Sequence, residues 1–228
     1  MIGARGSAAD EPGWIEADHL VVAARNLDEA AAWCEATFGV APVAGGRHAT
    51  MGTHNRLLGL GGYAYPRTYL ELIALDPDAK APTRTRWFDL DSAALRASLE
   101  AGPRLVHWVA RTARLDTAVA DLRALGHDPG EPMAAERMTP HGLLRWRITL
   151  RDDGRRPAAG AVPLLIEWGE GGHPAEHLPA SGVAIERIAI GGVDAAVAAR
   201  LGVSAEAAGA ALAVRFASPR GRVELRVG

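Results

Sequence analysis

Two histidines and two glutamates stand at matching places in this chain, and side chains of these types can bind a metal ion or transfer protons. Each lies inside a short apolar run that is typical of a buried strand: His19, Glu71, His107 and Glu167. A charged carboxylate in such a strand is costly unless it is paired or ligated. The pattern therefore predicts a common partner for these four side chains.

The spacing around them indicates a unit that occurs twice. A leucine that opens a predicted helix lies eight residues after each histidine, at Leu27 and Leu115. A glycine suited to end that helix follows, at Gly39 and at Gly126. Strand-like runs come next, and the last of them contains the glutamate. We interpret each unit as a strand, a helix and three strands.

Strand periodicity predicts where the four side chains point, because successive side chains alternate between the two faces of a sheet. We expect the apolar neighbours of each one to pack on the helix. The second histidine then lies opposite Val106 and Trp108, and the second glutamate opposite Ile166 and Trp168. All four side chains would share the open face. Two imidazoles and two carboxylates suit Zn, Ni, Mn, Fe(II) or Co, and the alternative is a metal-free cluster of ion pairs and hydrogen bonds.

Four segments resemble the vicinal oxygen chelate (glyoxalase/bleomycin resistance/dioxygenase) superfamily, and more closely its glyoxalase-like domain proteins. They are residues 18–22, 51–57, 69–73 and 165–168, and the resemblance spans roughly residues 15–177. It implies paired βαβββ modules that form a half-open barrel around a cleft. In metal-binding members the ligands come from the first and last strands of each module, which here hold His19, Glu71, His107 and Glu167. One glutamate can also act as a base, and we expect Glu167 in that role, with Glu71 as the alternative.

The expected fold class is therefore α+β, with paired modules and a degenerate third unit of βαββ order at the C-terminus. That unit keeps the packing pattern and lacks the histidine. The expected boundaries are a flexible leader over 1–14, the first module over 15–78, a linker over 79–103, the second module over 104–177, and the third unit, packed on the main domain, over 183–228.

A polar triplet just before an apolar strand is a candidate substrate site. His54, Asn55 and Arg56 can bind an anionic or carbonyl group, and an arginine can do so with two hydrogen bonds. The alternative is a polar loop that leads into a strand. His173 and His177 have the i, i+4 spacing of helical metal ligands, but flanking glycines and a proline favour a loop there.

Composition limits the remaining choices. The 228 residues are 48% hydrophobic and carry a formal net charge of -2, so no basic field favours nucleic acid or an anionic membrane. No apolar run approaches the roughly 18 residues of a membrane helix. The only cysteine, Cys34, excludes an intramolecular disulfide and falls on the apolar face of the first predicted helix. We expect a cytoplasmic protein.

These observations and the resemblance lead to one function and two alternatives. The leading expectation is a metal-dependent, glyoxalase-like enzyme acting on a small carbonyl or enediolate substrate, by lyase or isomerase proton transfer. The first alternative is a metal-free protein that binds or sequesters a small molecule in the same cleft. The second is an extradiol-type dioxygenase. The expected partner is a small molecule, and a homodimer stays open because two modules in one chain can complete a cleft alone.

Overall fold

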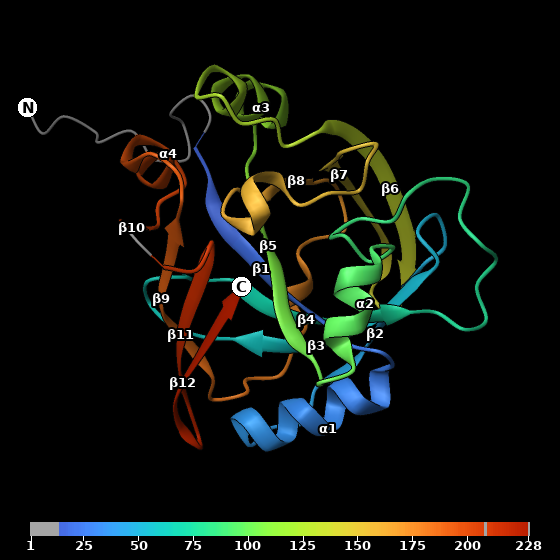
Figure 1. The fold of residues 1–228 in the computed structure, drawn as a ribbon. Coiled ribbons are helices and arrows are strands. Elements are labelled where there is room, and N and C mark those ends of the chain that lie inside the picture. The colour runs from blue at the N-terminus through green and yellow to red at the C-terminus, as the bar shows by residue number, and fades with distance from the viewer. Residues whose placement is uncertain (1–13, 208, 228) are drawn as a thin grey trace, which may run out of the picture.

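The computed structural model describes residues 14–207 and 209–227, so nearly all of the expected leader lies outside the described residues. Two modules of the same element order follow one another (Figure 1). The first contains β1 (Glu16–Ala23), α1 (Leu27–Phe38), β2 (Val43–His48), β3 (Thr53–Leu60) and β4 (Thr68–Leu75). The second contains β5 (Arg104–Arg111), α3 (Leu115–Ala124), β6 (Glu131–Thr139), β7 (Gly142–Leu150) and β8 (Leu164–Trp168).

The two modules share one eight-stranded sheet with the order β2-β3-β4-β1-β5-β8-β7-β6. Within each module the first and last strands are parallel, and the antiparallel pair of β1 and β5 joins the modules. The edge strands β2 and β6 approach one another, so the sheet curves into a nearly closed barrel. This confirms the predicted α+β fold with repeated modules.

Local signals set both ends of α1. The side chain of Asn26 caps α1 by accepting a hydrogen bond of 2.8 Å from the backbone N–H of Glu29. Gly39 ends the helix in the left-handed conformation, with φ 79°. Ala30, Cys34 and Phe38 are buried on one face of the helix. Glu29 does not close a capping box with Asn26, because its side chain pairs with Arg25.

Alternation along the strands divides the apolar residues between two cores. In β1, Leu20 and Val22 join the core under the helices, whereas Val21 and Ala23 join the core that surrounds the cleft. The buried side chains of the third unit belong to the same helix-side core. The cleft therefore lies on the face of the sheet that the helices leave free.

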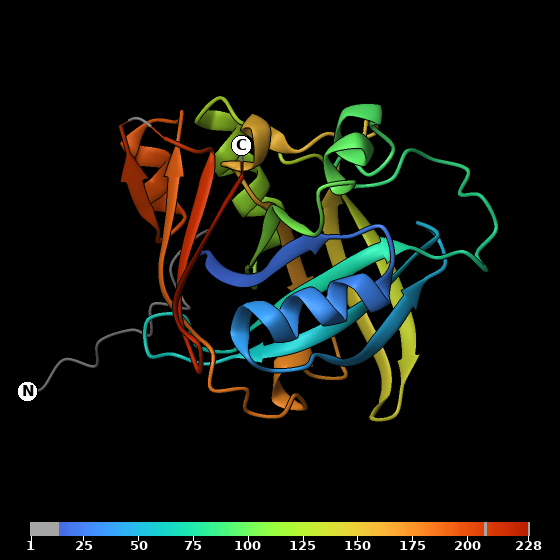
Figure 2. The same ribbon diagram turned by 60° about the horizontal axis from the view of Figure 1, so that its bottom comes forward.

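The third unit contains β9 (Ala184–Gly191), α4 (Ala195–Arg200), β10 (Ser204–Glu206), β11 (Leu212–Ser218) and β12 (Gly221–Val227). It has one more strand than the expected βαββ order. Its sheet, β10-β9-β11-β12, stands at one side of the molecule in Figures 1 and 2. Phe216 packs edge-on against Phe38 of α1, with ring centroids 5.2 Å apart. The unit thus covers the helix side and leaves the cleft open.

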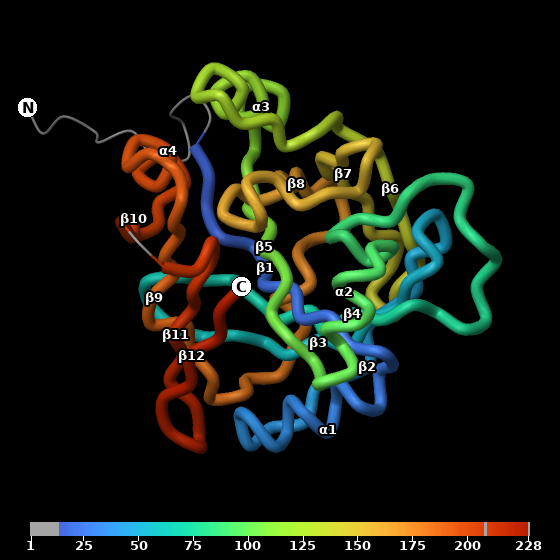
Figure 3. Tube along the Cα trace, viewed as in Figure 1, coloured from blue at the N-terminus to red at the C-terminus, as the bar shows by residue number. Residues whose placement is uncertain are grey.

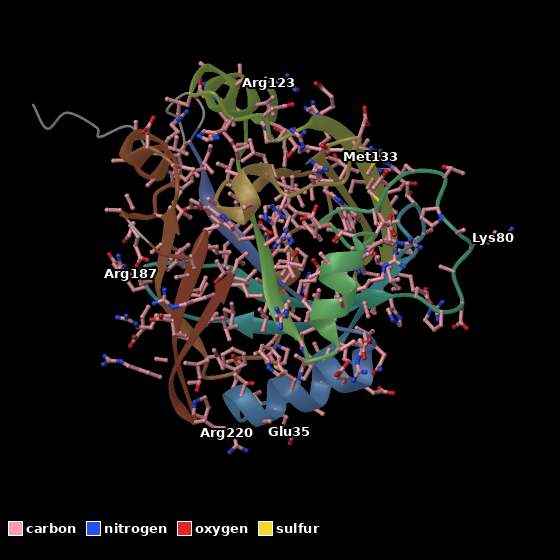
Figure 4. All side chains as sticks on the ribbon, viewed as in Figure 1. Glu35, Lys80, Arg123, Met133, Arg187 and Arg220 are labelled. Atoms are coloured by element: carbon pink, nitrogen blue, oxygen red, sulfur yellow. The ribbon has the colours of Figure 1, made fainter. Side chains whose placement is uncertain are left out.

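The segment between the modules runs from the end of β4 to β5 and contains α2 (Ala93–Leu99). Its tube in Figure 3 swings outward before it returns to the body of the molecule, and Figure 4 shows Lys80 at the far side of this excursion. The returning part carries Trp87 and Phe88, both buried in the cleft-side core. Among the described helices, none is long and apolar enough to cross a membrane.

Candidate functional site

A polar pocket lies inside the curved sheet, between the first module and the β6–β8 strands. Its polar walls come from His19, His48, Asn55, Glu71 and Arg137. Aromatic and aliphatic side chains make up the rest of the lining: Leu57, Tyr69, Trp87, Phe88, Leu144, Trp146, Ile148, Ile166 and Trp168. Such a small number of polar groups in an apolar wall is typical of a ligand site.

Glu71 is the buried carboxylate of this pocket. It lies on the cleft face of β4, and only 7% of its side chain is exposed. Its Oε1 accepts a hydrogen bond of 2.6 Å from the side-chain amide of Asn55 on β3. The backbone N–H of Gly46 donates to Oδ1 of Asn55 at 2.7 Å, which fixes the amide so that its NH₂ faces Glu71. Two module-one strands therefore hold this carboxylate in one orientation.

His19 faces Glu71 across the pocket. Its Nε2 lies 3.7 Å from Oε2 of Glu71, and its ring stacks on Tyr69 with centroids 4.7 Å apart. Nδ1 lies 2.6 Å from Oδ1 of Asp18. Because the Asp18 carboxylate needs a donor, Nδ1 carries a proton and Nε2 is directed into the pocket.

Asp18 is a fully buried carboxylate behind the pocket. Its Oδ2 accepts hydrogen bonds from Nε2 of His173 at 2.9 Å and from Nε1 of Trp168 at 2.8 Å. The backbone N–H of Ala175 donates to Nδ1 of His173, so the proton of this imidazole is on Nε2. Burial alone would raise the pKa of Asp18, but the hydrogen bonds from His173 and His19 outweigh burial and hold that pKa well below its usual range. Asp18 is thus a charged anchor that orients His19.

His48, at the end of β2, closes the other side of Glu71. Its Nε2 lies 3.8 Å from Oε1 of Glu71, and its Nδ1 lies 3.0 Å from the hydroxyl of Thr53. Burial lowers the pKa of His48 to about 4, helped by the positive charge of Arg137 and opposed by the charge of Glu71. His48 is therefore a neutral hydrogen-bonding group at pH 7.

The second-module histidine, His107, is covered rather than exposed to the pocket. It pairs with Val21 across the central strands, so it lies on the cleft side of the sheet. Its Nε2 accepts a hydrogen bond of 3.2 Å from the backbone N–H of Leu164, and its ring lies 5.4 Å from that of Phe88. Burial holds the pKa of His107 well below its usual value. It is part of the wall behind the pocket.

Glu167 lies on the face of the sheet away from the pocket. The predicted orientation of β8, with Glu167 on the open face, is therefore wrong. Ile166 and Trp168 face the cleft, so Glu167 faces α3. Its carboxylate accepts a hydrogen bond of 3.2 Å from the backbone N–H of Leu115 and one of 3.1 Å from Arg147. The start of α3 has no side-chain cap of its own, and a carboxylate is favourable at a helix N-terminus. Glu167 therefore stabilises the start of α3 and does not line the pocket.

The predicted substrate triplet is divided by strand alternation. Asn55 faces the pocket, whereas His54 and Arg56 are absent from its lining. Arg56 extends toward α1, where it donates a hydrogen bond of 3.3 Å to Asp28. The triplet is part of β3 rather than a loop before it, so its members cannot act on one ligand.

The four predicted metal ligands do not meet. His19 and Glu71 lie together with His48, but His107 is covered and Glu167 is on the far face of the sheet. The described residues contain no group of three or more His, Cys, Asp or Glu side chains placed to hold a metal ion. The donor set does not fit the metal that the family resemblance implies, and no proposed step goes through one.

Sequence reasoning missed three side chains that shape the pocket: Asp18, His48 and Arg137. Asp18 precedes His19 in the quoted motif, but strand alternation predicts it on the other face. His48 and Arg137 lie on β2 and β6, the two strands with the weakest sequence patterns. The sequence favours a loop at His173, and this residue does hold Asp18 from the loop before η3 (Pro174–Glu176).

The comparisons with known proteins agree with the fold described above. A family model described as a glyoxalase-like domain matches residues 17–205. A solved hypothetical protein from Staphylococcus aureus is 16% identical, with a TM-score of 0.56, over 94% of this chain and 86% of that chain. Methylmalonyl-CoA epimerase from Mycobacterium tuberculosis aligns over 71% of this chain and 94% of that chain at 18% identity, with a TM-score of 0.40. No curated protein matches.

Proposed function

The chain belongs to the glyoxalase-like domain family, and on that premise we propose that it is an enzyme that transfers a proton next to the carbonyl group of a small oxygen-rich substrate. Glu71 is the proposed base. His19 in its imidazolium form, with a proton on each ring nitrogen, is the proposed donor to the carbonyl oxygen. This proposal keeps the reaction class expected from the sequence and moves the base from Glu167 to Glu71.

The observation that carries the proposal is the unshared oxygen of Glu71. Oε1 is occupied by Asn55, whereas Oε2 accepts no hydrogen bond from the described residues. The two nearest imidazole nitrogens are 3.7 and 3.8 Å from the carboxylate, beyond hydrogen-bonding distance. A buried carboxylate with one free oxygen, directed into a pocket, is the arrangement that a general base requires.

His19 supports the second half of the step. Removal of a proton next to a carbonyl places negative charge on the carbonyl oxygen, and a hydrogen-bond donor at that oxygen stabilises the charge. Asp18 fixes the His19 ring through Nδ1–H, so a proton on Nε2 points toward the substrate. A substrate whose carbonyl oxygen lies on Nε2 of His19 can present the adjacent C–H to the free oxygen of Glu71.

The apolar wall of the pocket serves the same chemistry. Trp87, Trp146 and Trp168 line it together with aliphatic side chains. These side chains exclude water from the carboxylate and strengthen each electrostatic contact with the substrate. The pocket thus favours proton transfer between substrate and protein over exchange with bulk water.

A direct experiment is to follow hydrogen exchange at carbon by proton NMR in D₂O. The probes are pyruvate, 2-oxobutyrate, hydroxyacetone and dihydroxyacetone, each with catalytic amounts of the protein. We expect faster loss of the C–H signal next to the carbonyl for at least one probe than in buffer alone. Binding of a probe, detected by line broadening, without any exchange would favour the sequestering protein over the enzyme.

A further inference from the structure

We propose that Arg137 forms an anion subsite at the mouth of the pocket and that the natural ligand is a small 2-oxo carboxylate. This inference rests on the proposed function for the position of the carbonyl group. It adds the chemical class of the ligand and a residue that binds it.

The guanidinium of Arg137 has no partner in the part of the chain that the structure describes. Among the described residues it makes no hydrogen bond or ion pair, and its Nη1 atom is buried. The arginines of the neighbouring strand differ: Arg145 pairs with Glu136, and Arg147 pairs with Asp116 and Glu167. A buried guanidinium N–H without an acceptor is costly, and an anionic ligand removes that cost.

The position of Arg137 joins two hollows. It lines the polar pocket around Glu71, and it also lines a second hollow of ≈ 190 Å³ between β2, the β6–β7 hairpin and the loop around His173. Leu57 and Leu144 are common to both linings. Figure 4 marks Met133 on β6, the strand that carries Arg137. Arg137 therefore stands at the wall that the two hollows share.

The charge pattern favours an anion at this point. The described linings of the two hollows contain no lysine and no other arginine. The positive charge of Arg137 reaches the pocket, since it helps to lower the pKa of His48. A single guanidinium binds one carboxylate with two parallel hydrogen bonds. A phosphate group usually needs more donors than this junction offers, so we assign a carboxylate.

The facing strand leaves room for the guanidinium. A side chain at Gly46 of β2 would place its Cβ 1.9 Å from Nη1 of Arg137. The backbone of Gly46 does not need the left-handed conformation, so glycine there provides space rather than a turn. Substitution of Gly46 should thus displace the cation without removing its charge.

The two ends of the ligand follow from these positions. The carboxylate lies on Arg137, the neighbouring carbonyl oxygen lies toward Nε2 of His19, and the carbon beyond it lies toward Glu71. In the reaction a C–H bond breaks, its proton goes to Glu71, and its electron pair forms the enolate. The same proton or one from solvent then returns to carbon, so no oxidant or reductant is needed.

The test measures binding separately from exchange. Pyruvate and 2-oxobutyrate are titrated by calorimetry or ligand-observed NMR into the wild type and into Arg137→Met, Arg137→Lys and Gly46→Ala. Methyl pyruvate and inorganic phosphate are titrated as probes without the carboxylate. Arg145→Met is the control, because Arg145 is half exposed and already paired.

We expect Arg137→Met to weaken binding of the 2-oxo acids by about 10-fold or more, which is the effect of losing a charge-assisted hydrogen bond. Lysine should restore part of the affinity, Gly46→Ala should reduce it, and Arg145→Met should leave it unchanged. Methyl pyruvate should bind equally to all variants. Equal binding of the acids to wild type and Arg137→Met overturns the subsite, as does a preference for phosphate or no binding of the acids to wild type. If binding follows this pattern without hydrogen exchange, the subsite stands and the proposed enzymatic function fails.

Discussion

Oδ1 of Asp18 lies 2.6 Å from Nδ1 of His19, although the two residues are consecutive in β1. Consecutive side chains of a regular strand point to opposite faces. The pairing of β1 with β5 shifts register between Ala17 and His19, and this bulge turns both side chains to the same side. The orientation of the pocket histidine thus depends on an irregularity in the central strand.

The Asp18→Asn variant should lose stability and pocket order. Asparagine keeps the shape, but its NH₂ group faces donors on His19, His173 or Trp168, so at least one buried donor loses its acceptor. We expect the free energy of unfolding at pH 7 to fall by about 3 kcal/mol, as when one partner of a buried charged network is removed. Urea denaturation measures this change. Asp116→Asn, at an exposed ion pair, is the control and should change stability by less than about 1 kcal/mol.

Asp18 also makes the stability of the folded protein depend on pH in the acid range. The pKa of Asp18 is lower in the folded protein than in the unfolded chain. Its contribution to the free energy of unfolding is therefore fully present above the unfolded pKa of 3.8, and it is lost as pH falls from there toward the folded pKa. The wild type should therefore lose its stability advantage over Asp18→Asn below about pH 4. A constant difference between the two proteins down to pH 2 would contradict the buried, charged state of Asp18.

His48 should make the wild type less stable in mild acid. Its pKa is 6.5 for a solvent-exposed histidine and about 4 in the folded protein, so the unfolded chain binds a proton first as pH falls. Stability should decrease between pH 6.5 and pH 4 by up to about 3 kcal/mol. The His48→Gln variant should lack this part of the decrease. Unfolding curves at pH 7 and pH 5 for both proteins make the comparison, and parallel pH profiles would show that His48 is not buried in neutral form.

Glu167 should behave as a structural residue. Its carboxylate serves the first turn of α3 and Arg147, and about a quarter of its side chain is exposed. The Glu167→Gln variant should lose about 0.5–1 kcal/mol of stability and keep both ligand binding and hydrogen exchange. Loss of hydrogen exchange in a Glu167→Gln variant that still folds would show that Glu167 acts in the site.

Much of the fold follows from local sequence signals. The stop at Gly39 and the apolar face around Cys34 are local properties of the first helix, and the structure confirms both. The repeat of these signals at equal spacing predicts two modules of one kind. Each of these features depends on neighbours within a few turns of the chain, which explains why one sequence is enough to find them.

The site was harder to predict because its geometry depends on distant contacts. Glu167 faces α3 because Ile166 and Trp168 pack in the cleft, and alternation alone does not say which face of β8 meets the helix. Asp18 joins the pocket through a bulge that forms only when β1 pairs with β5. Arg137 meets Gly46 only because the sheet curves until the two edge strands approach. Simple alternation along β1 and β4 predicts His19 and Glu71 on the cleft face, and Asn55 belongs to the polar triplet that the sequence indicates as a binding site.

The central claim is that Glu71, and not Glu167, is the base of this protein. Its most direct test compares Glu71→Gln with Glu167→Gln for deuterium incorporation from D₂O into 2-oxobutyrate at the carbon next to the carbonyl. We expect Glu71→Gln to lower the exchange rate by about 100-fold or more, the usual contribution of a general base, while Glu167→Gln keeps the wild-type rate. Wild-type exchange in Glu71→Gln would contradict the account.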